Sequence, residues 1–331
     1  MIARTALGLL AALFLSSAAH AQLFRAYLAI NGNDANPCTL PQPCRLLPAA
    51  LNAVANGGEI WLLDSANYNT ATVNITKSVT ILAVPGAVGS VVATGGPAIS
   101  IATAGVKVAL RNLVLVPLPG GGGTAGVAMT EGNGLAVEGC LMAGLPNGIS
   151  ASGNVSLRVS DTTIRGGENG IVVADGAQAT VDRSTISDMS VYGVHVLSSV
   201  PSTNTAASLQ GSTVERTFVG VFALSSNASG TARVSARDSH LTANGYGAAA
   251  QSNVGGAAIL NLLGNSITRN GYGVATFLAG ARAWLSANLV TDNTVTGLYT
   301  SGGLTETAGN NAVRNNESNS IGGAPTPASM M

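Results

Sequence analysis

The stretch SITRNGYGVATF, residues 266–277, decides the fold, because nearly the same phrase, SHLTANGYGAAA, occupies residues 239–250. Alignment on the second glycine of N-G-Y-G places both phrases in one repeat with steps of 22 to 27 residues. The repeat glycines are Gly126, Gly148, Gly170, Gly193, Gly220, Gly247, Gly273 and Gly297. An aliphatic anchor lies six or seven positions before the later glycines: Met142, Ile164, Ile186, Val214, Leu241, Ile267 and Val290. N-G-Y-G is therefore one turn of a coil and not an active-site loop that occurs twice.

Within each unit the apolar residues recur at every second position, which is the period of a β-strand. Val194 and Val196 flank His195, and in a second strand Leu157 and Val159 flank Arg158. The units contain no amphipathic helix that would connect the strands. Such strands stack as a parallel β-helix, and parallel crossovers are almost always right-handed. The sequence predicts an all-β, right-handed parallel β-helix of about nine or ten coils.

Ser, Thr and Asn residues recur at the predicted bends of the coil. One row lies two residues before the aliphatic anchors: Thr162, Ser184, Ser212, Ser239, Asn265, Asn288 and Asn311. A second row lies three residues after the anchors: Asn244, Asn270, Asn293 and Asn316. Because stacked strands lie about 4.8 Å apart, these side chains can hydrogen-bond along the axis and to the backbone of the bends.

The N-terminus has the features of a cleavable signal peptide over residues 1–21. Arg4 precedes an apolar run, and Ala19-His20-Ala21 provides small residues around the cleavage point after Ala21. The apolar run is too short to span a membrane. We therefore expect a secreted or periplasmic protein without a membrane span.

Three segments follow the signal peptide. Residues 22–95 are expected to form a cap and the first coils, with a short helix that places Leu47, Leu51 and Val54 on one face. We expect the right-handed parallel β-helix over residues 96–314. Residues 315–331 lack an apolar pattern and are predicted to be a disordered tail.

The cysteines indicate one disulfide and no metal site. Cys38 and Cys44 flank a proline-rich loop, and in an oxidising compartment they are expected to form a disulfide. A zinc site would need further Cys or His residues at ligand spacing nearby, and the sequence has none. Cys140 lies in an apolar context and is predicted to be a buried thiol. We expect neither a metal nor another cofactor.

The charge balance excludes a nucleic-acid partner. The 331 residues include 15 Lys and Arg, 15 Asp and Glu, and 42 Gly, so that only 9% are charged and the net charge is +0. Nucleic-acid binders concentrate Lys and Arg on one face. In the repeat register, opposite charges fall in adjacent coils: Arg111 with Glu138, Asp161 with Arg183, Asp188 with Arg216, and Arg269 with Asp292. These are typical of solvated surface pairs, and no cluster of carboxylates is apparent.

The phrases YLAINGNDANPCTLPQPCR, at residues 27–45, and TIxxNxxGV in the coils resemble exported bacterial right-handed β-helix proteins. These belong to a poorly characterised branch of the pectate-lyase-like superfamily. That superfamily includes lyases, glycosidases, esterases and surface-binding proteins, so the resemblance implies the fold but no single activity. The N-T-D, D-D, G-H-G and R-I-K motifs of polygalacturonase-like enzymes are absent from the sequence.

One row of side chains is a candidate binding site. The positions around the repeat glycine form an aromatic stripe: Tyr192, His195, Phe222, Tyr246, Tyr272 and Tyr299. Aromatic rings along a groove can stack on sugar rings. The alternative is that the rings fill a corner of the coil. His195 and His240 lie at outward positions on different faces, which is typical of surface histidines and not of a catalytic triad.

Three functions remain open. The first is a non-catalytic exported protein whose surface binds a glycan or another cell-envelope partner. The second is a lyase or hydrolase acting on an acidic polysaccharide, with Arg and Asp side chains from loops such as 198–206 and 225–230, whose longer turns would wall a cleft. The third is a structural or adhesive spacer.

Overall fold

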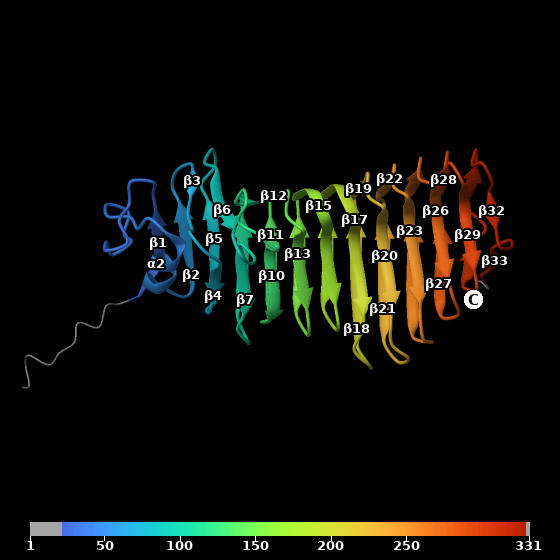
Figure 1. Cartoon of the computed structure of the whole chain (residues 1–331), viewed down its shortest axis with the longest axis horizontal. Coiled ribbons are helices and arrows are strands. Elements are labelled where there is room, and N and C mark those ends of the chain that lie inside the picture. Colours follow the sequence, from blue (N-terminus) through green and yellow to red (C-terminus); the bar gives the residue numbers. More distant parts are fainter. Residues whose placement is uncertain (1–21, 329–331) are drawn as a thin grey trace, which may run out of the picture.

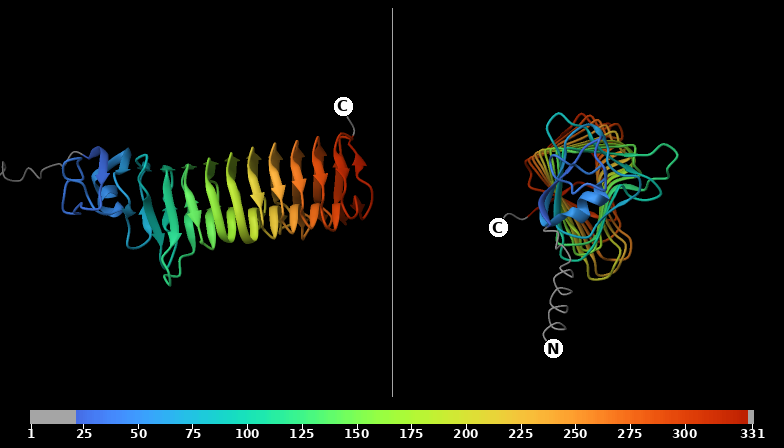
Figure 2. Two further views of the ribbon diagram at one scale, coloured as in Figure 1. Left: turned by 90° about the horizontal axis from the view of Figure 1, so that it is seen from above. Right: turned by 90° about the vertical axis from the view of Figure 1, so that its left-hand side faces the viewer.

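In the computed structural model of the chain, which describes residues 22–328, short strands wind around one long axis (Figure 1). Each strand pairs in parallel with its equivalent in the next coil, as β18 does with β21. The two further views show a straight rod of stacked coils (Figure 2). The predicted all-β, right-handed parallel β-helix is thus confirmed. The predicted signal peptide lies outside the described residues.

The coil has three faces, which we call sheet A, face B and face C. Sheet A consists of β1 (Leu23–Leu28), β2 (Val54–Leu62), β5 (Val79–Ala83), β8 (Lys107–Arg111), β11 (Gly134–Glu138), β14 (Ser156–Ser160), β16 (Gln178–Asp182), β18 (Asn204–Gln210), β21 (Thr231–Arg237), β24 (Ala257–Leu263), β27 (Ala281–Ser286), β30 (Leu304–Thr307) and β33 (Thr326–Pro327).

Faces B and C together make the second, 20-stranded sheet. Face B consists of β3 (Ala66–Asn67), β6 (Gly89–Ala93), β9 (Leu113–Pro117), β12 (Leu141–Ala143), β19 (Thr213–Glu215), β22 (His240–Thr242), β25 (Ser266–Thr268), β28 (Leu289–Thr291) and β31 (Ala312–Arg314). Face C consists of β4 (Val73–Ile75), β7 (Ile99–Ala102), β10 (Ala125–Glu131), β13 (Asn147–Ser152), β20 (Val219–Ser225), β23 (Tyr246–Ser252), β26 (Tyr272–Phe277), β29 (Thr296–Ser301) and β32 (Ser320–Ile321). Two longer strands run across both faces: β15 (Thr163–Ala174) and β17 (Thr185–Ser198).

Small aliphatic side chains fill the interior of the coil, one layer for each turn. Leu157 and Val159 of sheet A are buried, as are Val194 and Val196 of face C, whereas Arg158 between the first pair is exposed. The predicted inward and outward positions are therefore confirmed. A single coil cannot enclose these side chains, so burial depends on the neighbouring coils.

The repeat glycines are needed because adjacent coils approach closely at that point. A Cβ atom added to Gly220 would lie 2.5 Å from the carbonyl oxygen of Gly247. One added to Gly247 would lie 2.7 Å from the carbonyl oxygen of Gly273. Any side chain would push the coils apart, which explains why the residue recurs in every turn.

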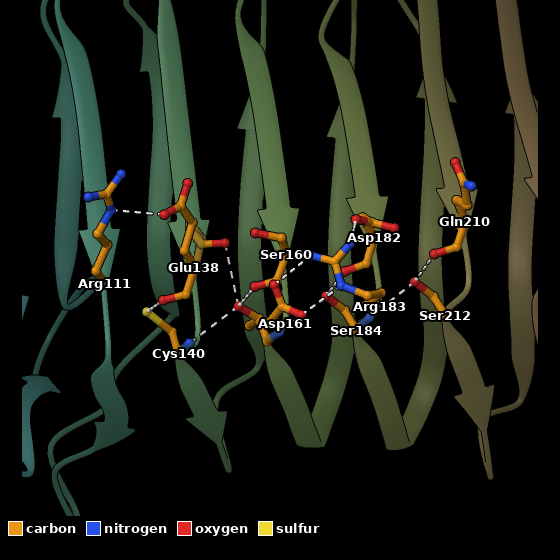
Figure 3. Close-up of polar contacts among 12 residues, drawn as sticks. Arg111, Glu138, Cys140, Ser160, Asp161, Asp182, Arg183, Ser184, Gln210 and Ser212 are labelled. Carbon is orange, nitrogen blue, oxygen red and sulfur yellow. Dashed lines mark hydrogen bonds and ion pairs between the residues drawn. The ribbon is translucent and has the colours of Figure 1, made fainter. Parts of the chain in front are cut away.

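Both predicted polar ladders are present at the corners between the faces, and Figure 3 shows part of the first. Between sheet A and face B, the backbone N–H of Ser184 donates to Ser212 Oγ at 3.2 Å. Between faces B and C, the backbone N–H of Asn244 donates to Asn270 Oδ1 at 2.9 Å. Cys140 is buried as predicted, and it also occupies the first position of the first ladder, where its Sγ accepts from the backbone N–H of Leu113.

A residue with a left-handed backbone precedes many of the ladder residues. Arg183 has φ 44° before Ser184, and Arg269 has φ 58° before Asn270. The left-handed residue turns the chain, and the next side chain points inward to accept a hydrogen bond from the preceding coil. Between sheet A and face B only two residues, Arg183 and Ser184, separate β16 from β17, whereas residues 269–271 separate β25 from β26 at the corner between faces B and C.

The N-terminal segment contains the predicted disulfide and the predicted helix, which is shorter than expected. Cys38 and Cys44 form the predicted disulfide, which is consistent with an exported protein. The helix, α2, covers Leu47–Ala53 and buries Leu47 and Leu51, but Val54 already begins β2. Among the described residues no helix is long and apolar enough to cross a membrane.

The C-terminal segment differs from its prediction. Residues 315–331 were expected to be disordered, yet residues 315–328 form a last, partial coil in which β32 pairs with β29 and β33 pairs with β30. The backbone N–H of Glu317 donates to the carbonyl oxygen of Asn293 at 3.1 Å. These are backbone bonds, which need no apolar side chains, so the composition of the segment did not reveal them.

Removing a ladder amide should weaken the fold strongly. In Asn270→Ala the backbone N–H of Asn244 and the carbonyl oxygen of Leu241 lose their side-chain partners. We expect a loss of about 2–4 kcal/mol in the free energy of unfolding, because buried polar groups remain unpaired. Urea unfolding measures this change. The exposed Asn253→Ala should change stability by less than about 0.5 kcal/mol, and an equal loss in both variants would contradict the role of the ladder.

Candidate functional site

A trough of about 600 Å³ lies on the outer surface of sheet A. Its floor is one row of short polar side chains from four successive coils: Thr180, Ser208, Ser235 and Asn261. In the same row, Arg158 stands at one end and Trp284 at the other. The trough arises because the floor residues are short and the end residues are long.

A second trough of about 530 Å³ continues from Arg158 toward the N-terminal end. Its floor includes Ala109 and Ala136, which belong to the same row, and Lys107 lies along its side. Because both troughs include Arg158, sheet A is hollowed over many coils.

Free cations outnumber free carboxylates on this surface. Four exposed basic side chains form no ion pair with another described residue: Lys107, Arg158, Arg233 and Arg282. By contrast, the outward carboxylates Glu59, Glu138 and Asp182 are each paired with an arginine. Glu306, which follows Trp284 in the row of the trough floor, is an outward carboxylate of sheet A without an ion pair to a described residue. The surface of sheet A therefore favours an anionic ligand over a cationic one.

Two carboxylates do lie near the trough, but Arg183 binds both of them (Figure 3). Arg183 donates to Asp161 through Nε at 2.9 Å and through Nη2 at 2.8 Å, and it also donates to Asp182. The hydrogen bonds from Arg183 lower the pKa of Asp161. A general acid must hold a proton at working pH, so Asp161 is poorly suited to act as the acid of a glycoside hydrolase.

Three of the four predicted charge pairs are present. Arg111 pairs with Glu138, Arg183 with Asp161, and Arg216 with Asp188. The predicted Arg269–Asp292 pair does not form, because Arg269 donates to Thr242 Oγ1 instead. The described residues contain no group of three or more His, Cys, Asp or Glu side chains arranged to hold a metal ion.

The turns 198–206 and 225–230 do not supply catalytic side chains. They contain neither Arg nor Asp, contrary to what the enzyme hypothesis required of them. Their polar groups are used for structure: Asn227 Nδ2 donates to the carbonyl oxygen of Ser198 at 2.8 Å, and Asn227 Oδ1 accepts from the backbone N–H of Gly230.

The predicted aromatic stripe is gathered on face C. Tyr192, His195 and Phe222 lie together at one end, and Tyr246, Tyr272 and Tyr299 continue the row. Phe218 and Phe277 complete the group, which we call the aromatic patch. Beneath the rings, Ala249 and Ala275 are fully covered.

The rings of the aromatic patch pack mainly against each other. Tyr246 and Tyr272 are stacked with centroids 4.6 Å apart and planes 10° apart, and Tyr192 and Phe222 are stacked at 5.2 Å. Each of these stacks covers one face of each of its two rings, and further rings approach Tyr246 and Tyr272 edge to face. Sugar stacking needs a free ring face, so the aromatic patch is less suited to it than Trp284 in the trough.

His195 is held within the aromatic patch and is not an ordinary surface histidine. Its ring lies 4.3 Å from Tyr192 and 5.5 Å from Phe222, centroid to centroid, and its Nε2 is buried without a hydrogen-bond partner among residues 22–328. Burial lowers the pKa of His195 to about 4. His240 is exposed on face B, as predicted.

The sequence contained a signal for the trough that was not used. The outward positions of sheet A carry a run of short polar residues between Arg158 and Trp284, once in each coil. Short residues in adjacent coils make a hollow, but the pattern contains no catalytic residue type and therefore does not stand out.

Residues 120–206 match the family described as "Right handed beta helix region". Solved structures share the fold at low identity. The A-module of the mannuronan C-5 epimerase AlgE4 of Azotobacter vinelandii has a TM-score of 0.54 at 12% identity, over 83% of this chain and 91% of that chain. A rhamnogalacturonan lyase has a TM-score of 0.54 at 10% identity, over 83% and 82%.

The GH136 lacto-N-biosidase of Eubacterium ramulus has a TM-score of 0.58 at 11% identity, over 92% of this chain and 67% of that chain. Structures of the same fold thus include epimerases, lyases and hydrolases. At these identities the likeness establishes the right-handed β-helix and no activity. No curated protein matches the chain in sequence.

The buried imidazole predicts a stability that depends on pH. The pKa of His195 is about 4 in the folded protein, and an unfolded histidine has a pKa near 6.5. The stabilisation is therefore complete above about pH 6.5 and is lost as the pH falls toward 4, by about 3 kcal/mol in the free energy of unfolding. Urea unfolding between pH 7 and pH 4 measures the loss.

A variant and a control assign this loss to one residue. His195→Phe should remove the part of the decline between pH 6.5 and pH 4, because phenylalanine has no proton to take up. His240→Gln should leave that part unchanged, since His240 is exposed. The assignment is wrong if both variants decline as the wild type does.

Proposed function

We propose that the protein is an exported β-helix protein that binds an extended polysaccharide along sheet A without cleaving it. The observation that carries this proposal is the trough between Arg158 and Trp284, whose floor presents hydroxyl and amide groups. Glycan sites combine an aromatic ring with a few polar groups that orient the sugar hydroxyls. Trp284 can supply the ring, and the floor residues can supply the polar groups.

The dimensions suit a chain and not a single sugar. The outward row from Thr80 to Trp284 covers eight steps between adjacent coils. At the spacing of parallel strands this is about 38 Å. An extended glycan lying along the solenoid axis would therefore meet equivalent side chains at regular intervals.

The charge of the surface supports an anionic glycan. Lys107 and Arg158 line the troughs without carboxylate partners among the described residues, and Arg233 and Arg282 lie in the neighbouring outward row. Carboxylates or sulfates repeated along a polysaccharide can each bind such a cation. The similar structures named above include proteins that act on mannuronan and rhamnogalacturonan, which agrees with a glycan ligand.

Binding without cleavage is supported by the state of the carboxylates. Asp182 lines the trough, but Arg183 holds it in an ion pair. A hydrolase would need one protonated and one free carboxyl group across the scissile bond, and a calcium-dependent lyase would need several carboxylate ligands.

A second candidate function is a polysaccharide lyase. The observation that favours it is Arg158, an exposed guanidinium in the trough with no ion pair to a described residue, which is the type of group that can assist removal of a proton from a uronate. A structural or adhesive spacer is the third candidate, and it predicts no glycan binding.

Substitution of Trp284 should weaken binding without unfolding the protein. We expect Trp284→Ala to raise the Kd for polygalacturonate or alginate oligosaccharides by up to about tenfold, because the stacking surface is lost. Isothermal titration calorimetry measures the change. Trp61→Ala is the matched control, since Trp61 also faces outward on sheet A but stacks on Arg25 outside the troughs. Equal weakening by both variants would contradict the site.

The role of charge and the lack of turnover can be tested with the same ligands. Arg158→Ala should weaken binding of polygalacturonate more than that of a neutral xylan, and added salt should reduce the difference, because salt screens exposed charges. Incubation of the wild type with each ligand should yield neither unsaturated products nor new reducing ends. Products that disappear in Arg158→Ala would establish the lyase instead, and a failure to bind any glycan would favour the spacer.

A further inference from the structure

We propose that the aromatic patch on face C is an interface at which two copies of this chain pack side by side across a two-fold axis. The patch lies on a different face from the troughs and is not used by the proposed glycan site. It contains four of the six tyrosines and three of the five phenylalanines of the chain. Tyr and Phe are enriched at protein interfaces, and charged residues are depleted from interface cores.

Large apolar side chains are exposed around the patch. Phe218 is 57% exposed, Leu278 at the opposite margin is 47% exposed, and Ile321 extends the row beyond Tyr299 with 40% exposure. Contiguous exposed apolar surface of this kind marks interaction sites. The interior of the coil is already filled by other residues, and although Phe218 packs edge to face on Tyr246, more than half of it stays exposed in the single chain.

The exposed atoms of the patch suit a protein surface better than a sugar. Tyr246 and Tyr272 each cover one ring face of the other, and Phe218 and Tyr299 approach them edge to face, so little free ring face remains for a sugar. The hydroxyls of Tyr192, Tyr246, Tyr272 and Tyr299 donate to no other described residue. An apposed chain can accept these hydrogen bonds while it covers the apolar edges.

The absence of charge on the part of face C that carries the aromatic patch permits two copies to meet there. Residues 192–198 of β17 and the whole of β20, β23, β26 and β29 contain no Asp, Glu, Lys or Arg. In a two-fold interface the same surface faces itself, so a charged patch would place like charges opposite each other. Sheet A carries several free cations and could not associate in this way.

The area agrees with a dimer interface of moderate size. From the coil of His195 to that of Ile321 there are five steps between coils, about 24 Å, and from Phe218 to Ser225 there are seven steps between residues, about 23 Å. Each copy thus offers roughly 550 Å² and a pair roughly 1,100 Å², which passes the value of about 1,000 Å² expected of a specific interface.

Sedimentation velocity over a concentration series tests the proposal on the mature protein. We expect a monomer–dimer equilibrium in the wild type that Phe218→Glu shifts toward monomer by at least tenfold in Kd, because two buried charges would enter the interface. Leu289→Glu is the matched control: Leu289 is an exposed leucine on face B, with 39% exposure, and its replacement should leave the equilibrium unchanged. Circular dichroism melts confirm that each variant is folded.

Small-angle X-ray scattering distinguishes a side-by-side dimer from an end-to-end dimer. A side-by-side dimer thickens the rod and leaves its maximum dimension close to that of the monomer, whereas an end-to-end dimer nearly doubles it. A wild type that remains monomeric at 200 µM overturns the proposal. So do a dimer that Phe218→Glu leaves intact, a dimer of doubled length, and a monomer whose patch binds xylan in a Phe218-dependent manner.

Discussion

The whole structure depends on keeping successive coils in register at the spacing of neighbouring β-strands. The corner between sheet A and face B enforces this register, and from Thr217 onward the corner between faces B and C does so as well, because backbone N–H groups there donate to a Ser or Asn oxygen of the next coil. A shift of one residue would leave these buried donors unpaired and would turn core side chains outward. The third corner is less constrained. Residues Ala174 to Gln178 make a short turn there and Ser198 to Asn204 a longer one, which accounts for much of the variation in repeat length.

Because the coils are in register, equivalent residues of successive coils form rows along the axis, and the outward rows determine what each face can bind. In the middle row of sheet A, short polar residues between Arg158 and Trp284 form the polar floor of the trough. In the rows of face C, aromatic residues in adjacent coils stack on one another, with Tyr246 on Tyr272 as the closest parallel pair. Because outward positions do not contribute to the core, each row can change without loss of the fold. The two surfaces therefore differ in character although they share one backbone.

The sequence was sufficient to predict the features that depend only on the spacing of the repeat. The repeat glycines, the inward aliphatics, both ladders and the grouping of aromatic residues on face C follow from spacing, since equivalent positions must stack. What depends on rotamers could not be predicted. Arg269 bonds to Thr242 and not to Asp292, and the rings of the aromatic patch turn their faces toward each other. The trough was missed for a different reason: it is defined by the small size of Ser208 and Ser235, and size differences in a polar row indicate no particular chemistry. The last coil was missed because backbone pairing holds it, which composition does not report.

The placement of the two surfaces has a consequence for binding strength. Sheet A and face C meet at one corner of the coil but face in different directions, so pairing through face C leaves sheet A of each copy open. A dimer would then carry two troughs on one rigid body. A polysaccharide repeats the same unit many times, so a chain bound in one trough is held at high effective concentration near the second. Exposed cations such as Arg158 and Lys107 bind single carboxylates only weakly in salt, and a modest contact of this kind benefits most from being repeated. In this view, retention on a glycan would come from the number of contacts, first along the rod and then between two rods, and no single deep pocket would be needed.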